Sequence, residues 1–129
     1  MGDDDRENWS TAGAALGALG VVLGAFGAHA LDRFHPPEGG VEWWRTAAHY
    51  HLIHALALLH AGRLAASGRP AARAAAALFL GGTVVFSGTL YLMALGAPRW
   101  FGAITPLGGL ALIAGWFALA LAHWRGRRS

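Results

Sequence analysis

The sequence predicts an all-α integral membrane protein, a bundle of four transmembrane helices joined as antiparallel hairpins. Its 129 residues are 55% hydrophobic and only 13% charged, whereas a soluble domain carries about 25% charged residues. Short polar connections divide the chain into four apolar segments, each close to the ~20 residues that cross a bilayer. We predict helices at about 9–29, 43–62, 72–95 and 100–124 within one membrane domain, 1–129.

The first segment, from Trp9 to Ala28, contains no charged residue. A secretory signal peptide is the alternative interpretation, because Ala28-His29-Ala30 imitates a cleavage site. The acidic start, Asp3-Asp4-Asp5, argues against a signal peptide, as does an apolar stretch longer than the usual limit of ~15 residues. We therefore expect a transmembrane helix here.

Proline and glycine mark the connections between the segments. Two prolines and a pair of glycines lie within 31–42, and Gly96-Ala97-Pro98 leaves room only for a tight turn. The first two helices, and the last two, should therefore pair as hairpins. In the fourth segment Pro106 cannot donate a hydrogen bond to the carbonyl of Gly102, which predicts a kink.

All ten basic residues are arginines, and they lie mostly in the connections. This placement argues against a nucleic-acid surface and for a membrane topology. One end of the predicted bundle holds Arg6, Arg63, Arg69, Arg73, Arg125, Arg127 and Arg128, and the other holds Arg33, Arg45 and Arg99. Because basic residues concentrate on the cytoplasmic side, we expect the N and C termini to be cytoplasmic.

Glycines recur at helical spacing in three of the segments. In the first segment they are spaced four, three, four and three residues apart, which places them on one stripe. Small residues let membrane helices approach closely, so we expect packing seams there. The expected packing glycines are Gly13, Gly17, Gly20, Gly24 and Gly27, then Gly88, spaced seven from Gly81, then Gly108 and Gly115. Whether the partner of a seam is another helix of this chain or another copy stays open.

Histidine is the titratable residue type found well inside a predicted span, and such groups are candidate functional positions. The candidate polar core consists of His29, Tyr50, His54, Ser87, Tyr91 and Thr105. We favour hydrogen bonds between helices as the role of these groups. The alternative is a haem or metal site, with His51 and His54 on one side of the second helix as weak candidate ligands. His49 and His60 are expected to point the opposite way.

No cofactor is predicted, because no carboxylate lies inside a span and the spacing matches no defined metal motif. The chain also has no cysteine, which removes disulfides and thiol chemistry. We find no nucleophile elbow, no phosphate-binding loop and no spaced pair of carboxylates. The sequence therefore predicts a protein that is not an enzyme.

Several short blocks along the chain form a pattern. These blocks are Gly24-Ala25-Phe26-Gly27-Ala28-His29, Trp44, Thr46, Tyr50, His54, Gly82-Thr83, Phe86-Ser87-Gly88-Thr89-Leu90-Tyr91, Thr105-Pro106-Leu107-Gly108-Gly109 and Ala114-Gly115-Trp116. Together they resemble the YgdD/YwdK-like family of small inner-membrane proteins. The resemblance covers nearly the whole chain and implies a multi-pass plasma (inner) membrane protein of unknown function. His49 and His51 depart from the family pattern, which argues against His51 and His54 as a shared metal site.

Two hypotheses for function follow. The first is a structural, assembly or accessory subunit that packs through its glycine-rich faces in the lipid bilayer, as a homo-oligomer or within a larger membrane complex. The alternative is a cofactor-binding role, or transport of protons or small solutes, centred on His29, Tyr50 and His54.

Overall fold

The computed structural model describes residues 3–128, with side chains from Asn8 onward, and shows an all-α four-helix bundle. Its long helices are α1 (Asp3–His29), α2 (Gly40–Ala66), α3 (Pro70–Ala94) and α4 (Thr105–Gly126). Two short 3-10 helices, η1 (Leu31–Phe34) and η2 (Arg99–Ala103), lie in the first and third connections. The side chain of Arg6, which entered the arginine count, lies outside the described part.

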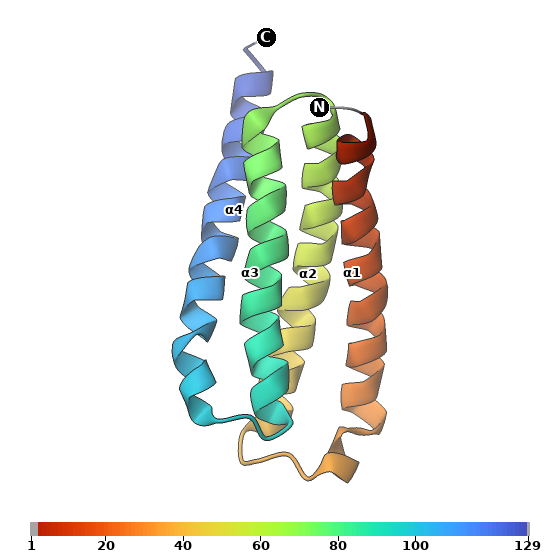
Figure 1. The fold of residues 1–129 in the computed structure, drawn as a ribbon, viewed down its shortest axis with the longest axis vertical. Helices are drawn as coiled ribbons and strands as arrows, with labels where there is room; N and C mark the ends of the chain where they lie inside the picture. Colours follow the sequence, from red (N-terminus) through yellow and green to blue (C-terminus); the bar gives the residue numbers. More distant parts are fainter. Residues whose placement is uncertain (1–2, 129) are drawn as a thin grey trace.

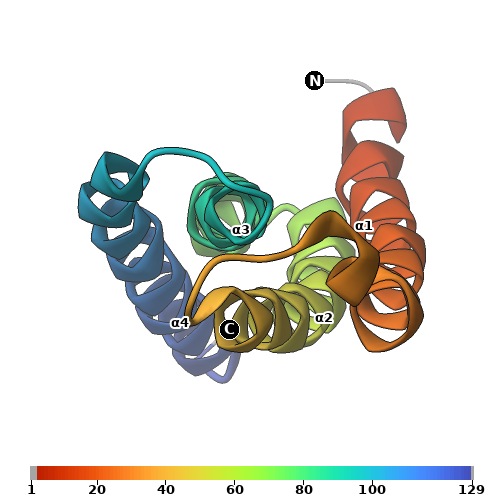
Figure 2. The same cartoon turned by 90° about the horizontal axis from the view of Figure 1, so that it is seen from below.

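The helices run up and down as two hairpins (Figure 1). The two ends of the chain lie at one end of the bundle together with the α2–α3 connection, and the other two connections lie at the opposite end. α1 packs against α2, α2 against α3, and α3 against α4, whereas α2 and α4 touch at few points. Viewed along the bundle, α1 and α4 lie on opposite sides of the α2–α3 pair (Figure 2). The helices therefore form an open row that α2 and α3 hold together at its centre.

Three helices are longer than the sequence predicts at one or both ends. α1 begins at Asp3 instead of residue 9. α2 runs from Gly40 to Ala66, and α3 begins at Pro70, which lies in the first turn where its missing N–H costs nothing. Helical hydrogen bonding thus continues beyond the apolar segments from which the bounds were predicted.

The predicted continuous fourth helix with a kink at Pro106 is wrong. Residues 99–103 form the 3-10 helix η2, and α4 starts at Thr105 with Pro106 in its first turn. Proline at this position disrupts no hydrogen bond, because the first N–H groups of a helix lack partners inside it. The break at Ile104 therefore separates two helices instead of bending one.

Alanine dominates the contact between α2 and α3. Ala61, Ala75 and Ala76 are fully buried there, around the equally buried rings and side chains of Phe79 and Leu58. Small side chains let two helix backbones approach closely, which is how helices associate when hydrophobicity does not distinguish neighbour from lipid. This interface forms the core on which α1 and α4 are placed.

The glycine stripe of α1 packs against α2, so its partner lies within the chain. A Cβ atom added at Gly13 would lie 2.7 Å from the backbone nitrogen of Leu59, and one at Gly20 would lie 2.8 Å from Leu52 Cδ2. Gly27 faces the indole of Trp44, and Gly17 lies opposite Ala55. Gly24 meets no atom within 4 Å. Four of the five predicted positions therefore form the seam.

The glycines predicted to pack in α4 do so within the bundle, whereas the one predicted in α3 does not. Gly108 lies against the backbone of Phe86, and Gly115 lies against the ring of Phe79. Gly88, predicted to pack, meets nothing within 4 Å, and the same holds for Gly81. Gly82 takes this role instead, since a Cβ there would lie 2.8 Å from Leu112 Cδ2. The face of α3 that meets α4 is thus rotated by one residue from the face expected.

Candidate functional site

The ring of His51 joins three helices. Its Nε2 lies 2.7 Å from the carbonyl oxygen of Leu16 in α1, and its Nδ1 lies 2.9 Å from the hydroxyl of Tyr91 in α3. A carbonyl can only accept, so Nε2 carries the proton and Nδ1 accepts from the tyrosine hydroxyl. The side chain is only 3% exposed. His51 is therefore a neutral, fully bonded imidazole at the centre of the bundle.

The ring of His54 faces a different neighbour, α4. Its Nδ1 lies 2.7 Å from the carbonyl oxygen of Tyr50, one turn earlier, and its Nε2 lies 3.0 Å from Trp116 Nε1. Indole only donates, so Nε2 accepts and the proton is on Nδ1. His51 and His54 thus hold opposite tautomers, and in this arrangement neither ring has a free lone pair for a metal.

Three further polar contacts fasten neighbouring helices. Ser87 donates to the carbonyl of Ala47 at 2.8 Å, which joins α3 to α2. The hydroxyls of Thr89 and Thr105 lie 2.7 Å apart and join α3 to the start of α4. Trp44 Nε1 donates to the carbonyl of Leu23 at 2.8 Å, which joins α2 to α1. Each pair of long helices adjacent in the sequence is therefore joined by at least one hydrogen bond from a side chain.

Some predicted site residues do not come together. His29 lies exposed at the end of α1, and no contact joins it to Tyr50 or His54 in the described part of the chain. His51 and His54 do not share a side, because α1 and α3 surround one ring and α4 meets the other. Within residues 3–128 no group of three or more His, Asp or Glu is placed to hold a metal ion.

Two residues have roles that sequence reasoning missed. Trp44, which the sequence singles out only as part of the family pattern, is 4% exposed and lies against Gly27. His60 was expected to point away from His54, but both meet α4, since His60 Nε2 lies 2.9 Å from His123 Nε2. For Trp44 the signal is the glycine stripe, because a tryptophan that faces such a stripe is expected to be buried. For His60 the sequence contains no comparable signal.

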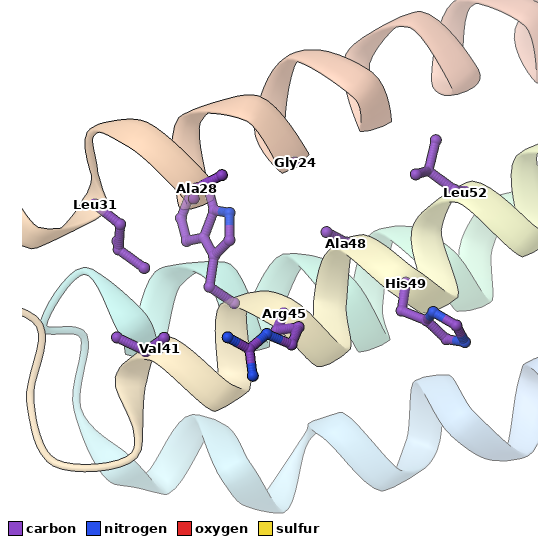
Figure 3. Close-up of a pocket in the computed structure, with 10 residues that line it drawn as sticks. Gly24, Ala28, Leu31, Val41, Arg45, Ala48, His49 and Leu52 are labelled. Carbon is purple, nitrogen blue, oxygen red and sulfur yellow. The ribbon is translucent and has the colours of Figure 1, made fainter.

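Two hollows border α2. One, of about 330 Å³, lies between α1 and α2 near Gly24, Trp44 and Arg45 (Figure 3). Arg45 forms an ion pair at 2.9 Å with Glu42, and both side chains are exposed. The other hollow, of about 500 Å³, lies between α2 and α4 beside His54. His49 lines both hollows.

The fold and the bonded interior define a class of protein. Three stretches, Asn8–His29, Pro70–Ala94 and Arg99–Gly126, are long and apolar enough to cross a membrane. Within these stretches Ser87, Tyr91 and Thr105 bond to other helices, as expected where the surroundings offer no water. These features define a small α-helical membrane protein with several passes.

Comparison with known proteins identifies the family. The profile of the family described as "Protein of unknown function (DUF423)" matches residues 23–109. The UPF0382 membrane protein YwdK of Bacillus subtilis is 41% identical over 112 residues, 85% of this chain and 90% of YwdK. The UPF0382 inner membrane protein YgdD of Escherichia coli K12 is 38% identical over 118 residues, 89% of this chain and 88% of YgdD. No solved structure matches.

The chain therefore belongs to the DUF423 (UPF0382) family of multi-pass membrane proteins of unknown function. The resemblance noted in the sequence is confirmed. The match begins in the second half of α1 and ends in the first turns of α4. It includes Trp44, His51, His54, Ser87 and Tyr91, whereas Leu16 and Trp116, which bond the two buried histidines, lie outside it.

Proposed function

We propose that this protein is a four-pass, non-catalytic subunit of the cell membrane, with both termini in the cytoplasm, that assists the assembly of a larger unit. The observation that carries the proposal is the state of its interior. The histidines buried in the bundle, His51 and His54, have both ring nitrogens bonded to protein groups. A catalytic or transporting imidazole exchanges its proton with a substrate or with water, whereas these ring nitrogens contact protein groups, so the rings serve better as structural ties.

The position of α2 supports four crossings. α2 is less apolar than the other long helices, and it carries the intramembrane histidines. It is nevertheless 27 residues long, about 40 Å at 1.5 Å per residue. It also packs along both α1 and α3. A helix held between two spanning helices crosses with them, because its polar groups are satisfied by those neighbours.

The arginines support the proposed orientation. The α2–α3 connection and the C-terminal end lie together at one end of the bundle (Figure 1). Arg69 approaches the end of α4 there, 3.5 Å from the carbonyl of Ala122, and Arg128 lies over the ring of Trp124 at 4.3 Å. Arg99 lies near Trp43 at the other end, 5.6 Å from its ring centre. The end with more arginines is the one we place in the cytoplasm.

The absence of native cysteine makes the topology directly testable. Single-cysteine variants Ser67→Cys and Glu38→Cys place one thiol in the α2–α3 connection and one in the α1–α2 connection. In intact cells a membrane-impermeant maleimide should label Glu38→Cys and leave Ser67→Cys unlabelled until the membrane is permeabilised. The reverse pattern would place the termini outside, and labelling of both in intact cells would contradict four crossings.

The proposed assembly role rests on glycines that have no partner within the bundle. Gly81 and Gly88 each meet no atom within 4 Å, so a neighbouring helix could approach them closely. Gly81 and Gly88 are seven residues apart and share a face of α3. The face suits a second copy or another membrane protein.

The mass of the tagged protein, extracted in mild detergent and measured by light scattering, tests this role. The proposal expects a complex larger than the monomer. Gly88→Leu should reduce the amount of this complex at least tenfold. Val21→Leu on the exposed face of α1 is the control and should leave the complex intact. A parent protein that is monomeric and carries no other protein would contradict the assembly role.

A further inference from the structure

The hollow between α2 and α4 is a cleft at membrane depth. It encloses about 500 Å³, within the range of small-molecule sites, which runs from about 300 to 1,000 Å³. Tyr50 is ten residues after the start of α2, about 15 Å along a helix of about 40 Å. Ile53 and Ile113 at the rim are 41% and 54% exposed, so the cleft opens on the outer surface. A ligand would therefore enter it from the lipid.

The cleft exists because α2 and α4 are joined towards one end only. Their side-chain ties are His54 to Trp116 and, a further two turns along, His60 to His123. Before the first tie, Gly109 leaves the α4 wall without a side chain, and Phe86 of α3 closes the back. Figure 2 shows α4 crossing at an angle to α2, with α3 beside both. The opening is thus a wedge between two fastened helices.

Aromatic residues make up much of the wall of the cleft, and no Asp, Glu, Lys or Arg lines it. The ring of Tyr50 lies 4.9 Å from that of Phe86 and is stacked at 5.9 Å on His54. The ring of His54 is in turn 5.8 Å from that of Trp116. Such walls suit a flat, neutral ring, because aromatic pairs stack and a charged ligand would find no counter-ion.

Two hydrogen-bond donors at the mouth have no protein partner. The hydroxyl of Tyr50 and the ring nitrogens of His49 make no hydrogen bond to any group in the described part of the chain. Polar groups exposed to lipid are costly, and they mark functional positions when they face a cavity. Both groups can donate to an oxygen acceptor on a bound ring.

We infer that the α2–α4 cleft binds a lipid-soluble quinone, with its ring between Tyr50 and Trp116 and a carbonyl oxygen accepting from the Tyr50 hydroxyl or the His49 ring. A quinone matches each feature: it is flat, neutral, dissolved in the membrane and edged by acceptor oxygens. The inference concerns binding only. It does not depend on the assembly role, which uses other faces of the molecule.

The test uses the full chain in lipid nanodiscs, titrated with a decyl-tailed benzoquinone while tryptophan fluorescence is followed. Empty nanodiscs correct for partition of the quinone into lipid. The inference expects saturable quenching by the quinone and none from decylbenzene, which has the same tail and no carbonyl oxygens. Absence of saturable quenching, or equal saturation by decylbenzene, would overturn it.

Three variants sharpen the test. Tyr50→Phe should weaken binding about 5-fold, the effect of losing one hydrogen bond of ~1 kcal/mol. Gly109→Leu should abolish binding by filling the cleft. A Cβ at Gly109 lies 3.6 Å from Phe86, an ordinary contact, so the fold should tolerate the change. Val21→Leu is the control, because Val21 is 64% exposed on α1 and lies outside the cleft.

Each variant is first checked for an unchanged thermal transition in detergent, so that loss of binding is not loss of fold. Binding by Gly109→Leu equal to the parent, or equal loss in Val21→Leu and Gly109→Leu, would also overturn the inference. A parent protein that is monomeric but still binds the quinone would contradict the assembly role alone. The two proposals therefore fail separately.

Discussion

α2 is packed in contrasting ways on its two sides. Towards α1 the backbones approach closely over most of their length, through a stripe of glycines and a buried tryptophan. Towards α4 the helices touch at few points, and side-chain bonds span the gap beside a cleft of about 500 Å³. The comparison teaches that helices adjacent in the chain are held by close backbone packing together with hydrogen bonds, whereas the non-adjacent pair α2 and α4 is held mainly by side-chain hydrogen bonds beside a cleft.

The largest expected effect comes from breaking the α1–α2 seam. Gly13→Ala should lower the free energy of unfolding by about 2 kcal/mol, because its Cβ would lie 2.7 Å from the backbone nitrogen of Leu59. Gly24→Ala on the same stripe is the control, and should raise stability by about 0.5–1 kcal/mol, since it removes glycine flexibility without a clash. Reversible unfolding in SDS–detergent mixtures measures both. Equal effects would show that the stripe is not a close seam.

A smaller effect is expected where a side chain supplements the seam. A double-mutant cycle on His51→Ala and Tyr91→Phe should give a coupling of about 0.6–1.7 kcal/mol, the range for hydrogen bonds between membrane helices. The same unfolding assay measures the four proteins of the cycle. A coupling indistinguishable from zero would mean that the two side chains are neighbours without a bond.

The smallest effect is expected on the α4 side. Trp116→Phe keeps an aromatic ring in the cleft wall and removes only the donor to His54, so the loss of stability should be about 0.5 kcal/mol. Differential unfolding of this variant and the parent measures it. A loss as large as that of Gly13→Ala would show that the α2–α4 contact is as important as the α1–α2 seam, and would remove the contrast between the two sides.

Much of the architecture could be predicted because it depends on local rules. Hydrophobic length and the position of proline and glycine located the four long helices, the antiparallel hairpins and the two ends of the bundle. The bounds were less accurate, since the acidic residues that start α1 belong to its helix but not to its apolar segment. Pro106 was predicted inside a continuous helix for a similar reason, because the apolar pattern continues through both the 3-10 helix and the α-helix.

The interior was harder to predict, because spacing determines which residues share a face but not which helix that face meets. Gly82 packs on α4 while Gly81 does not, although they are adjacent in the sequence. His51 and His54 lie on neighbouring sides of α2 and were divided between different partners once α3 and α4 were placed. The pair of His60 with His123 joins residues 63 positions apart and leaves no trace in either segment.

The opposite tautomers of His51 and His54 give the molecule two internal reporters. In nitrogen-15 NMR spectra a ring protonated at Nε2 and one protonated at Nδ1 produce different patterns of shifts, so the two imidazoles are distinguishable by chemistry before any assignment. One signal follows the junction of α1, α2 and α3, and the other follows the wedge between α2 and α4. A ligand entering the wedge would move the second pattern and leave the first in place, which would separate local occupancy from a change of the whole fold.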